Sequence, residues 1–532
     1  METLYYGGDI ITMEQENEEV EAVLVRDGKI QQKGSKLELE AQASEGVQRI
    51  DLEGKTLMPS FIDPHGHISF VGPVEQMANL SECTNFKEIQ ETLETYMTEN
   101  HHDSNSPVIG FGYDPTRLEE QQHPTKEILN AVSTESPIFI LHASGHMGCG
   151  NDRILDLAGI GQDTPDEDGG TIGRIEGSRE PNGYLEEGAM KPVQKTFSGR
   201  NLDYFKIAKQ GQDVYIRNGI TTVQDGASSR QTVQLFQALA QEEKLQIDVV
   251  SYPTMEGGGR DIMKENPDFA KVYQNRFKIG GYKIFLDGSP QGKTAWLTEP
   301  YEGEESYRGY PWYTDEQVKA YTTEAIEDGA QLLTHCNGDA AADQLLTSYE
   351  KALEASDRSD KNDLRPVMIH CQTVRNDQLD QMARIRMIPS IFMAHTYYWG
   401  DVHLKNLGDQ RGRRISPARS ALDRGLCVNF HQDPPVLKPD MLHTIWCAVN
   451  RQTRSGASIG PEERVSVYEA LQAVTINAAY QYREEDEKGS ITEGKLADLV
   501  VLDQNPLKVD PFSIRDIQVL ETIKEGESIY RV

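Results

Sequence analysis

The sequence is poor in cysteine and in basic residues, and it lacks long apolar runs. Its 532 residues include six cysteines, and no two of them form a CxxC pair. Such scattered cysteines indicate neither a disulfide framework nor a cysteine-type zinc site, so a cytoplasmic location, where thiols stay reduced, fits best. No stretch approaches the roughly 18 consecutive apolar residues of a membrane-spanning helix. The first residues, METLYYGGDIITMEQ, lack the basic and apolar regions of a signal peptide.

Basic residues are outnumbered by acidic ones. Lys and Arg total 53 against 85 Asp and Glu, which gives a formal net charge of −32. Nucleic acids and anionic membrane surfaces are bound by basic faces, so this balance argues against both as partners. We interpret the acidity as a source of solubility or salt tolerance rather than as a surface that attracts a cationic substrate.

The two ends of the chain are rich in short strands. Residues 1–57 contain β-prone stretches broken by Gly or Asp-Gly, among them LYYGGDIITM and AVLVRDGKIQQKG. Residues 486–532 contain ADLVVLD and IRDIQVLETIKEGESIYRV, which have the same character. We expect the two ends to form one β-sandwich.

The middle of the chain, residues 58–485, alternates strand-like and helix-like segments, as βα units around a parallel sheet do. Eight buried strands are expected, in SFIDPHGH, GITTVQDG, LQIDVVSYP, FKIGGYKIFLDGS, AQLLTHCNGD, RPVMIHCQ, RMIPSIFMAHT and GLCVNFHQD. Eight such strands predict an α/β fold, a (β/α)8 TIM barrel. The long interval between the first two strands exceeds an ordinary crossover, so we expect an inserted subdomain at about residues 70–218.

Four histidines stand at the expected carboxyl ends of barrel strands, where the chemistry of such barrels takes place. In His65-Gly66-His67, residues i and i+2 of a strand point the same way, so both imidazoles can reach one ion. His335 in LLTHCNGD and His370 in VMIHCQ each follow a short apolar run. Each alone is more often a hydrogen-bonded core residue, but their succession favours a metal site.

Two further residues extend this candidate site. Asp433, in CVNFHQDPPV, ends the eighth expected strand; it is either a turn former or a metal ligand that also moves a proton. Lys283 lies within an apolar strand, where an unpaired ammonium is costly. It either pairs with a carboxylate such as Asp287 or carries a carbamate, formed with carbon dioxide, that bridges two metal ions.

The order HxH, Lys, His, His, Asp on strands one, four, five, six and eight resembles the dinuclear metal pattern of the amidohydrolase superfamily. The segments LMPSFIDPHGH, KIFLDGS, LLTHCNGD and GSITEGKLADLVVLD are similar to its YtcJ-like branch, often called amidohydrolase family 3. The likeness covers nearly the whole chain. That branch carries its barrel on a β-sandwich built from both termini, in agreement with the independent interpretation of the two ends.

The resemblance implies roles for these residues. His65, His67 and Asp433 would bind the more buried ion, a carbamylated Lys283 would bridge, and two further histidines would bind a second ion. These two histidines are His335 and His370. The implied cofactor is a divalent metal at two ions per chain; the donors suit zinc, with iron, manganese and cobalt as alternatives.

The implied reaction is hydrolysis of a carbon–nitrogen bond, of the amide or formamide type and not a peptide bond, in a small molecule. A metal-activated hydroxide would attack, and Asp433 would take the proton from the water and return it to the leaving amine.

Other residues have two interpretations each. His146, in the insertion, either stabilises developing oxyanion charge or is an ordinary loop histidine. His395 ends the seventh strand at the expected barrel mouth and is a second catalytic candidate. The following Tyr397-Tyr398-Trp399 is either an aromatic wall for the substrate or core packing. At His431 the chain departs from the family, which more often has a small Gly-Ser pair before the aspartate; the imidazole either narrows the pocket or supports the metal ligands.

Two alternatives stay open for the function. With an ordinary Lys283, a single ion on His65, His67, His335 and Asp433 would resemble the mononuclear deaminases of the same fold. A non-catalytic binding or regulatory member is disfavoured because the ligand set is complete, and a Ser-His-Asp hydrolase because no G-x-S-x-G elbow is present. The oligomeric state is not indicated, and a homodimer is the commonest arrangement among oligomers.

Overall fold

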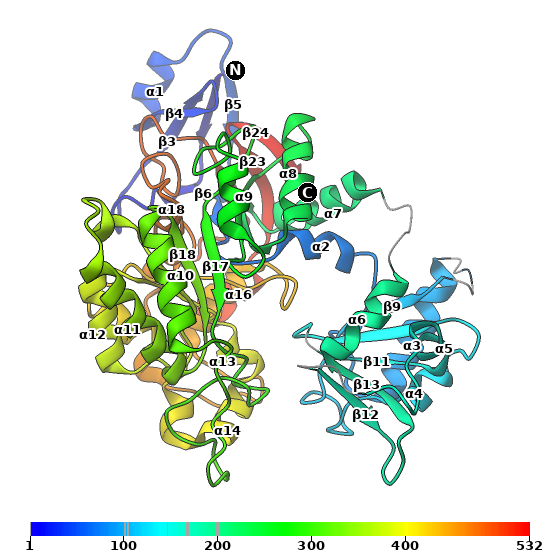
Figure 1. Ribbon diagram of the computed structural model, residues 1–532. Coiled ribbons are helices and arrows are strands. Elements are labelled where there is room, and N and C mark those ends of the chain that lie inside the picture. The colour runs from blue at the N-terminus through cyan, green and yellow to red at the C-terminus, as the bar shows by residue number, and fades with distance from the viewer. Residues whose placement is uncertain (1, 101–102, 104–105, 146, 166–169, 198–202) are drawn as a thin grey trace. The chain divides into compact units, whose positions relative to one another are not determined.

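The computed structural model describes residues 2–100, 103, 106–145, 147–165, 170–197 and 203–532 (Figure 1). The chain divides into two compact units, one formed by Met1–Ser69 with Gln212–Val532 and the other by Phe70–Gly211. Both divisions fall at helices, α2 (Ile68–Val74) and α7 (Tyr204–Arg217). The smaller unit ends at Gly211, within α7.

Two parallel sheets form the centre of the larger unit. Their strand orders are β16-β15-β14-β7 and β17-β18-β19-β20-β21, and every pairing within them is parallel. The bounds are β7 (Phe61–Ile62), β14 (Ile220–Ser228), β15 (Asp248–Pro253), β16 (Phe277–Ile279), β17 (Gly281–Phe285), β18 (Gln331–Cys336), β19 (Val367–His370), β20 (Ile388–Ile391) and β21 (Asn429–Phe430). Each of the eight expected segments contains a strand, and the carboxyl ends of neighbouring strands share one edge.

The fourth expected strand is divided at Gly280 into β16 and β17, which pair with different sheets. A parallel bridge between Thr254 and Lys283 joins the two sheets at this point. Every residue of β15, β19 and β20 is buried, because parallel strands are covered on both faces.

Helices follow most of these strands. Helices α10, α11 and α12 pack side by side, and α10 and α11 contact β18 (Figure 1). The helices of this part are α8 (Arg230–Gln241), α9 (Gly259–Glu265), α10 (Asp315–Glu327), α11 (Asp339–Ala355), α12 (Asn376–Ile385), α13 (His395–Tyr398), α14 (Gly400–Arg413), α15 (Ala418–Leu422), α16 (Met441–Asn450), α17 (Val467–Ala473) and α18 (Ile476–Tyr482). Thr314 begins α10 with a capping box that includes Gln317, which satisfies backbone N–H groups at the helix start.

The two ends of the chain meet in two further sheets. One has the order β4-β3-β1-β5 and the other, β2-β6-β22-β23-β24, combines strands from both ends. The bounds are β1 (Glu2–Tyr6), β2 (Asp9–Ile10), β3 (Ala22–Arg26), β4 (Lys29–Gly34), β5 (Gln48–Asp51), β6 (Thr56–Pro59), β22 (Leu499–Leu502), β23 (Val519–Lys524) and β24 (Glu527–Arg531), with α1 (Lys36–Gln42) beside them. One buried apolar cluster includes Tyr5 and Val23 from the first sheet and Leu57, Leu499 and Ile523 from the second. The two sheets thus share a core.

The smaller unit contains a six-stranded sheet with the order β12-β13-β11-β10-β9-β8. Its elements are β8 (Ala78–Asn79), α3 (Phe86–Glu99), β9 (Val108–Tyr113), α4 (Lys126–Asn130), β10 (Ile138–His142), β11 (Met147–Gly150), α5 (Asp152–Ala158), β12 (Gly170–Arg174), β13 (Pro181–Glu187) and α6 (Lys191–Thr196). Alternate residues of β10 belong to different apolar clusters, Ile138 and Ile140 to one and Phe139 to the other. Period-two alternation buries both faces of this sheet.

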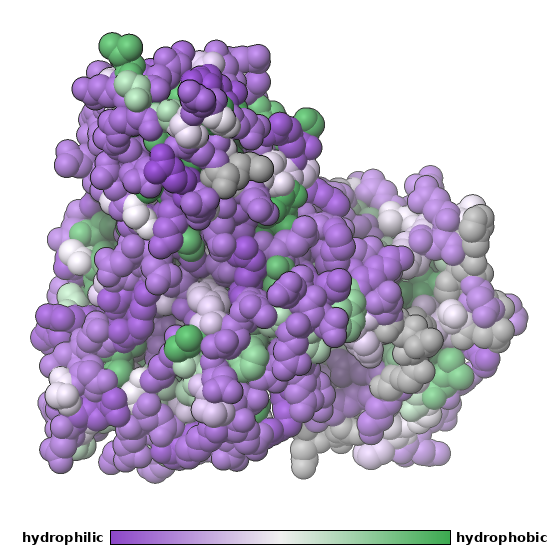
Figure 2. All heavy atoms as spheres, turned by 90° about the horizontal axis from the view of Figure 1, so that it is seen from above, coloured by the Kyte–Doolittle hydropathy of each residue, from purple (hydrophilic) through white to green (hydrophobic). Residues whose placement is uncertain are grey.

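The surface agrees with the composition. Hydrophilic residues cover most of the face that Figure 2 shows, with apolar residues scattered among them. The six cysteines are free thiols. Among the helices that the structure describes, none is both long and apolar enough to cross a membrane.

Candidate metal centre

Three buried side chains converge at the carboxyl ends of the parallel strands. One ligand atom each from His65, His370 and Asp433 can be chosen such that all three lie within 4.8 Å of one another. Nε2 of His65 is 3.5 Å and Nε2 of His67 is 3.2 Å from Oδ1 of Asp433, and Nε2 of His370 is 3.8 Å from its Oδ2. Two donors each about 2.1 Å from one tetrahedral ion lie about 3.4 Å apart. The observed spacings bracket this value, so the cluster fits a divalent metal.

The His65 imidazole is oriented by a contact at Nδ1, the ring nitrogen that does not face Asp433. Its Nδ1 lies 2.6 Å from Oε1 of Gln224, in the middle of β14, and Nε2 of Gln224 donates to the carbonyl of Pro64 at 2.7 Å. A Cβ on Gly226 would lie 2.7 Å from Cε1 of His65, so the backbone can approach the ring only with glycine there. These contacts leave Nε2 of His65 directed at Asp433.

His335 is held in a comparable way by Asp287. Nδ1 of His335 lies 3.4 Å from Oδ1 of Asp287, and the ring centroids of His335 and His370 are 4.5 Å apart. Asp287 is fully buried and also accepts backbone N–H bonds from Trp296, Asn337 and Gly338 at 2.7–3.0 Å. Asp287 therefore fixes two loops beside the site and faces a candidate ligand, not Lys283.

Lys283 is fully buried, and its Nζ has no hydrogen-bond partner among the described residues. Burial lowers the pKa of Lys283 to about 7, against an opposing effect of Asp433. A neutral amine is the form that reacts with carbon dioxide. The pairing of Lys283 with Asp287, one of the two interpretations of the sequence, is absent between these described side chains.

The pKa values of His65, His370 and Asp433 are all lowered, which favours binding of a cation. Burial, with positive neighbours such as Lys283, lowers the pKa of His65 well below 6.5; burial and nearby histidines do the same for His370. Burial alone would raise the pKa of Asp433, but the hydrogen bond and charge of His67, with His431 and Lys283, lower it overall. The lowered pKa values favour neutral imidazoles at His65 and His370 and an ionised carboxylate at Asp433, the protonation states that metal binding requires.

The backbone at two of the ligands is unusual. His370 has φ 75° and Asp433 has φ 56°. Non-glycine residues adopt this left-handed region at a cost and are enriched in it at functional sites. The conformation turns each side chain at the point where its strand ends.

Other candidates lie elsewhere. His146 falls outside the described residues. Nδ1 of His395 lies 3.1 Å from Nε2 of His403, and its ring packs on Phe392 and Trp399. His395 is thus a buried residue with a histidine partner, next to the metal cluster rather than within it.

The aromatic residues after His395 pack mainly on helix α16. The ring of Tyr397 contacts His443 and Trp446, and that of Tyr398 contacts His443. These contacts favour core packing over a substrate wall for the two tyrosines.

The sequence interpretation missed Gln224 and Ser390. Gln224 holds His65, and Ser390 Oγ lies 2.9 Å from Nδ1 of His431. Both are buried polar residues within strands, Gln224 in β14 and Ser390 in β20. GITTVQDG and RMIPSIF each contain an uncharged polar residue within an apolar strand, and such a residue could have indicated a contact with the site.

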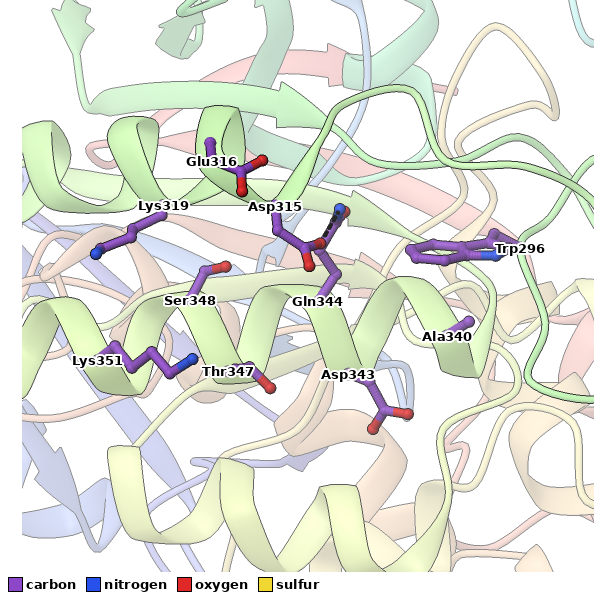
Figure 3. Close-up of a pocket in the computed structure, with 10 residues that line it drawn as sticks. All are labelled: Trp296, Asp315, Glu316, Lys319, Ala340, Asp343, Gln344, Thr347, Ser348 and Lys351. Atoms are coloured by element: carbon purple, nitrogen blue, oxygen red, sulfur yellow. Dashed lines mark hydrogen bonds between the residues drawn. The ribbon is translucent and has the colours of Figure 1, made fainter.

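A separate cleft of about 560 Å³ lies between α10 and α11. Figure 3 shows Asp315 and Gln344 facing each other, joined by a hydrogen bond of 2.9 Å, with Lys319 and Lys351 farther along the two helices. None of the metal-cluster residues lines it, and its described lining has no histidine or cysteine. The cleft is distinct from the candidate metal centre.

The fold and the cluster define a class of protein. A family model described as the amidohydrolase family matches residues 48–530, and the chain belongs to this family. The expected membership of the YtcJ-like branch is confirmed: the chain is 27% identical to the putative amidohydrolase YtcJ of Bacillus subtilis (strain 168), over 100% of this chain and 99% of that protein.

Two further relatives are informative. The chain is 28% identical to the N-substituted formamide deformylase of Arthrobacter pascens, over 98% of this chain and 96% of that protein. It shares its fold with an uncharacterized metal-dependent hydrolase from Pyrococcus horikoshii OT3, with a TM-score of 0.76 and 23% identity over 100% of both chains.

Proposed function

We propose that this chain is a metal-dependent hydrolase that cleaves a carbon–nitrogen bond of the amide or formamide type, other than a peptide bond, in a small molecule. The observation that carries this proposal is the convergence of His65, His370 and Asp433 at the strand ends of an amidohydrolase-family chain. We further propose that the two parallel sheets form a (β/α)8 barrel carried on the terminal sandwich, with Phe70–Gly211 as the inserted subdomain.

The donor set indicates how the site would work. A divalent cation held here would supply a hydroxide nucleophile at neutral pH and polarise the scissile carbonyl. His65, His67 and Asp433 would hold it, and imidazole with carboxylate suits zinc, although iron, manganese or cobalt accept the same donors. Gln224 keeps the His65 ring aimed at the shared point.

Asp433 has a second role in this proposal. The lowered pKa of Asp433 keeps its carboxylate ionised, and two imidazole nitrogens lie within 3.5 Å of its Oδ1. It can therefore accept a proton from the attacking water and return it to the leaving nitrogen.

We propose two ions per chain. Lys283, buried and without a hydrogen-bond partner, would carry a carbamate that bridges them, and His335 and His370 would hold the second ion. Formation of an N–C bond between the neutral amine and carbon dioxide, with release of a proton, would give an anion that two cations compensate, which would remove the cost of a buried, unpaired lysine. His335 is oriented for this by Asp287.

The substrate class rests on the deformylase relative, whose name states that it acts on N-substituted formamides. A cytoplasmic location is proposed from the six free thiols, and a homodimer from the frequency of that assembly.

Metal content and amine release test the proposal together. We expect about two equivalents of metal per chain by plasma mass spectrometry on protein purified without chelator, and release of amine from N-substituted formamides or simple amides. His65→Ala should lose metal. About one equivalent would replace the dinuclear site by a mononuclear one and direct the search to deaminase substrates; no metal after reconstitution with zinc or manganese would refute the hydrolase.

A further inference from the structure

His431 is fully buried beside the metal cluster, directly after β21. Its two ring nitrogens have different partners. Nε2 lies 3.2 Å from Nδ1 of His370, and Nδ1 lies 2.9 Å from Oγ of Ser390, which belongs to β20. Three neighbouring strands, β19, β20 and β21, thus contribute one hydrogen-bonded row that ends at a candidate metal ligand.

The protons in this row can be assigned from chemistry. Nε2 of His370 faces Asp433, so it must keep its lone pair to bind an ion. A neutral imidazole carries one N–H, which places the proton of His370 on Nδ1, where it donates to Nε2 of His431. The proton of His431 is then on Nδ1 and donates to Oγ of Ser390. Reversal of the row would leave a proton on the nitrogen of His370 that faces the site.

We infer that His431, anchored by Ser390, is a positioning residue that fixes the tautomer and ring orientation of His370 for metal binding. The inference rests on the proposed function in requiring that His370 bind a metal. Partners of this kind orient metal-bound histidines and raise their affinity for the ion. His431 is not itself a ligand, because both of its nitrogens are engaged in the row.

The row differs from the contacts that orient two other proposed ligands, His65 and His335. An amide oxygen accepts from Nδ1 of His65, and a carboxylate faces Nδ1 of His335. His370 faces an imidazole, which accepts at one nitrogen only if its own proton is on the other. Its orientation therefore depends on a second hydrogen bond, to Ser390, as well as on the first.

The experiment measures the affinity of the full-length chain for Zn²⁺ by competition with a chromophoric chelator, and the visible absorption spectrum of the Co²⁺ form. His431→Phe keeps a flat ring but removes both nitrogens; we expect the Kd for Zn²⁺ to rise about 10- to 100-fold, with an altered Co²⁺ spectrum. His431→Gln, whose amide oxygen can accept from His370, should keep most of the affinity. Ser390→Ala removes only the hydroxyl and should raise the Kd about two- to tenfold.

His443→Gln is the matched control, because its ring packs on Trp446 in α16 and contacts none of the cluster residues in the described contacts; its Kd should equal that of the wild type. Wild-type affinity in His431→Phe, or equal weakening in His431→Gln and His431→Phe, would overturn the inference. If His431→Phe does not fold, unchanged affinity in Ser390→Ala would overturn it. Failure of the wild type to bind metal would instead refute the proposed function, so the two failures are distinguishable.

Discussion

Two of the places where the larger unit buries charge have opposite outcomes. The first lies where the amino end of β15 meets the terminal sheets. Asp248 forms ion pairs with Lys488 and Lys524, and Lys524 also pairs with Asp498 at 2.7 Å. Burial alone would raise the pKa of Asp248, but the two lysines lower it overall. Each of these buried charges has a partner of opposite sign within the protein.

The second place is the candidate metal centre, formed by side chains at the carboxyl ends of the strands. Nζ of Lys283 is buried there without a hydrogen-bond partner among the described residues. A buried polar atom without a partner is costly, and it is tolerated where a ligand supplies the missing interaction. Buried charge is therefore not by itself the mark of the site: Lys524 is paired within the protein, whereas Nζ of Lys283 has no hydrogen-bond partner among the described residues.

The largest expected effect is a loss of catalytic rate on substitution of Asp433 in the candidate metal centre. Asp433→Asn keeps the shape of the side chain but removes its charge and basicity. We expect amine release to fall by about 10²- to 10⁴-fold or more, with an unchanged circular dichroism spectrum. The same substitution at the exposed Asp409 should have no effect. Near-normal turnover in Asp433→Asn would remove its role as proton acceptor.

The next largest effect is expected on stability, from the buried ion pairs of Lys524 with Asp248 and Asp498. Lys524→Met removes the ammonium that Asp248 and Asp498 share; Asp248 keeps Lys488, but the buried Asp498 loses its lysine partner. We expect the free energy of unfolding to fall by about 3–5 kcal/mol, measured by urea titration, while the Kd for Zn²⁺ in the folded protein stays unchanged. Lys508→Met, at an exposed pair with Asp9, should cost at most about 1 kcal/mol. Equal losses in the two variants would mean that the buried cluster contributes no more than a surface pair.

A smaller effect is expected from the support of a ligand. Gln224→Met removes the acceptor for Nδ1 of His65 at nearly constant volume, and the Kd for Zn²⁺ should rise about 10- to 100-fold. Gln224→Glu keeps an acceptor oxygen and should bind more tightly than Gln224→Met. If both variants bind alike, packing rather than the hydrogen bond orients His65.

Much of the fold and of the candidate metal site could be predicted from the sequence. Apolar runs located strands in all eight expected segments, and residues at their ends identified His65, His370 and Asp433, which the structure brings together. This works because parallel strands deliver their carboxyl ends to one edge. The division of the fourth strand at Gly280 was not predicted, since either half continues the same apolar pattern.

Contacts between side chains from distant segments could not be predicted. Gln224 and His65 are 159 residues apart in sequence, and whether Lys283 pairs with Asp287 depends on which way the Asp287 side chain faces. No local pattern encodes which carboxylate faces which cation. The paired cluster of Asp248 was missed for the same reason, because its lysines come from the end of the chain.

The smallest expected effect is the change in unfolding free energy on acidification, which tests the buried ion pairs of Asp248 and Glu484 in the wild type. The pKa values of Asp248 and Glu484 are lowered from 3.8 and 4.5, so their stabilisation is complete above these values and is lost as the pH falls below them. While such a carboxylate is protonated only in the unfolded chain, it costs about 1.4 kcal/mol of unfolding free energy per pH unit. Urea titrations from pH 6 to pH 3 should therefore show a steeper loss in the wild type than in Asp248→Asn/Lys524→Met, which lacks one of these carboxylates and one of their lysines. Equal slopes would mean that Asp248 protonates alike in the folded and unfolded chain, and the contrast between a paired and an unpaired end would fail.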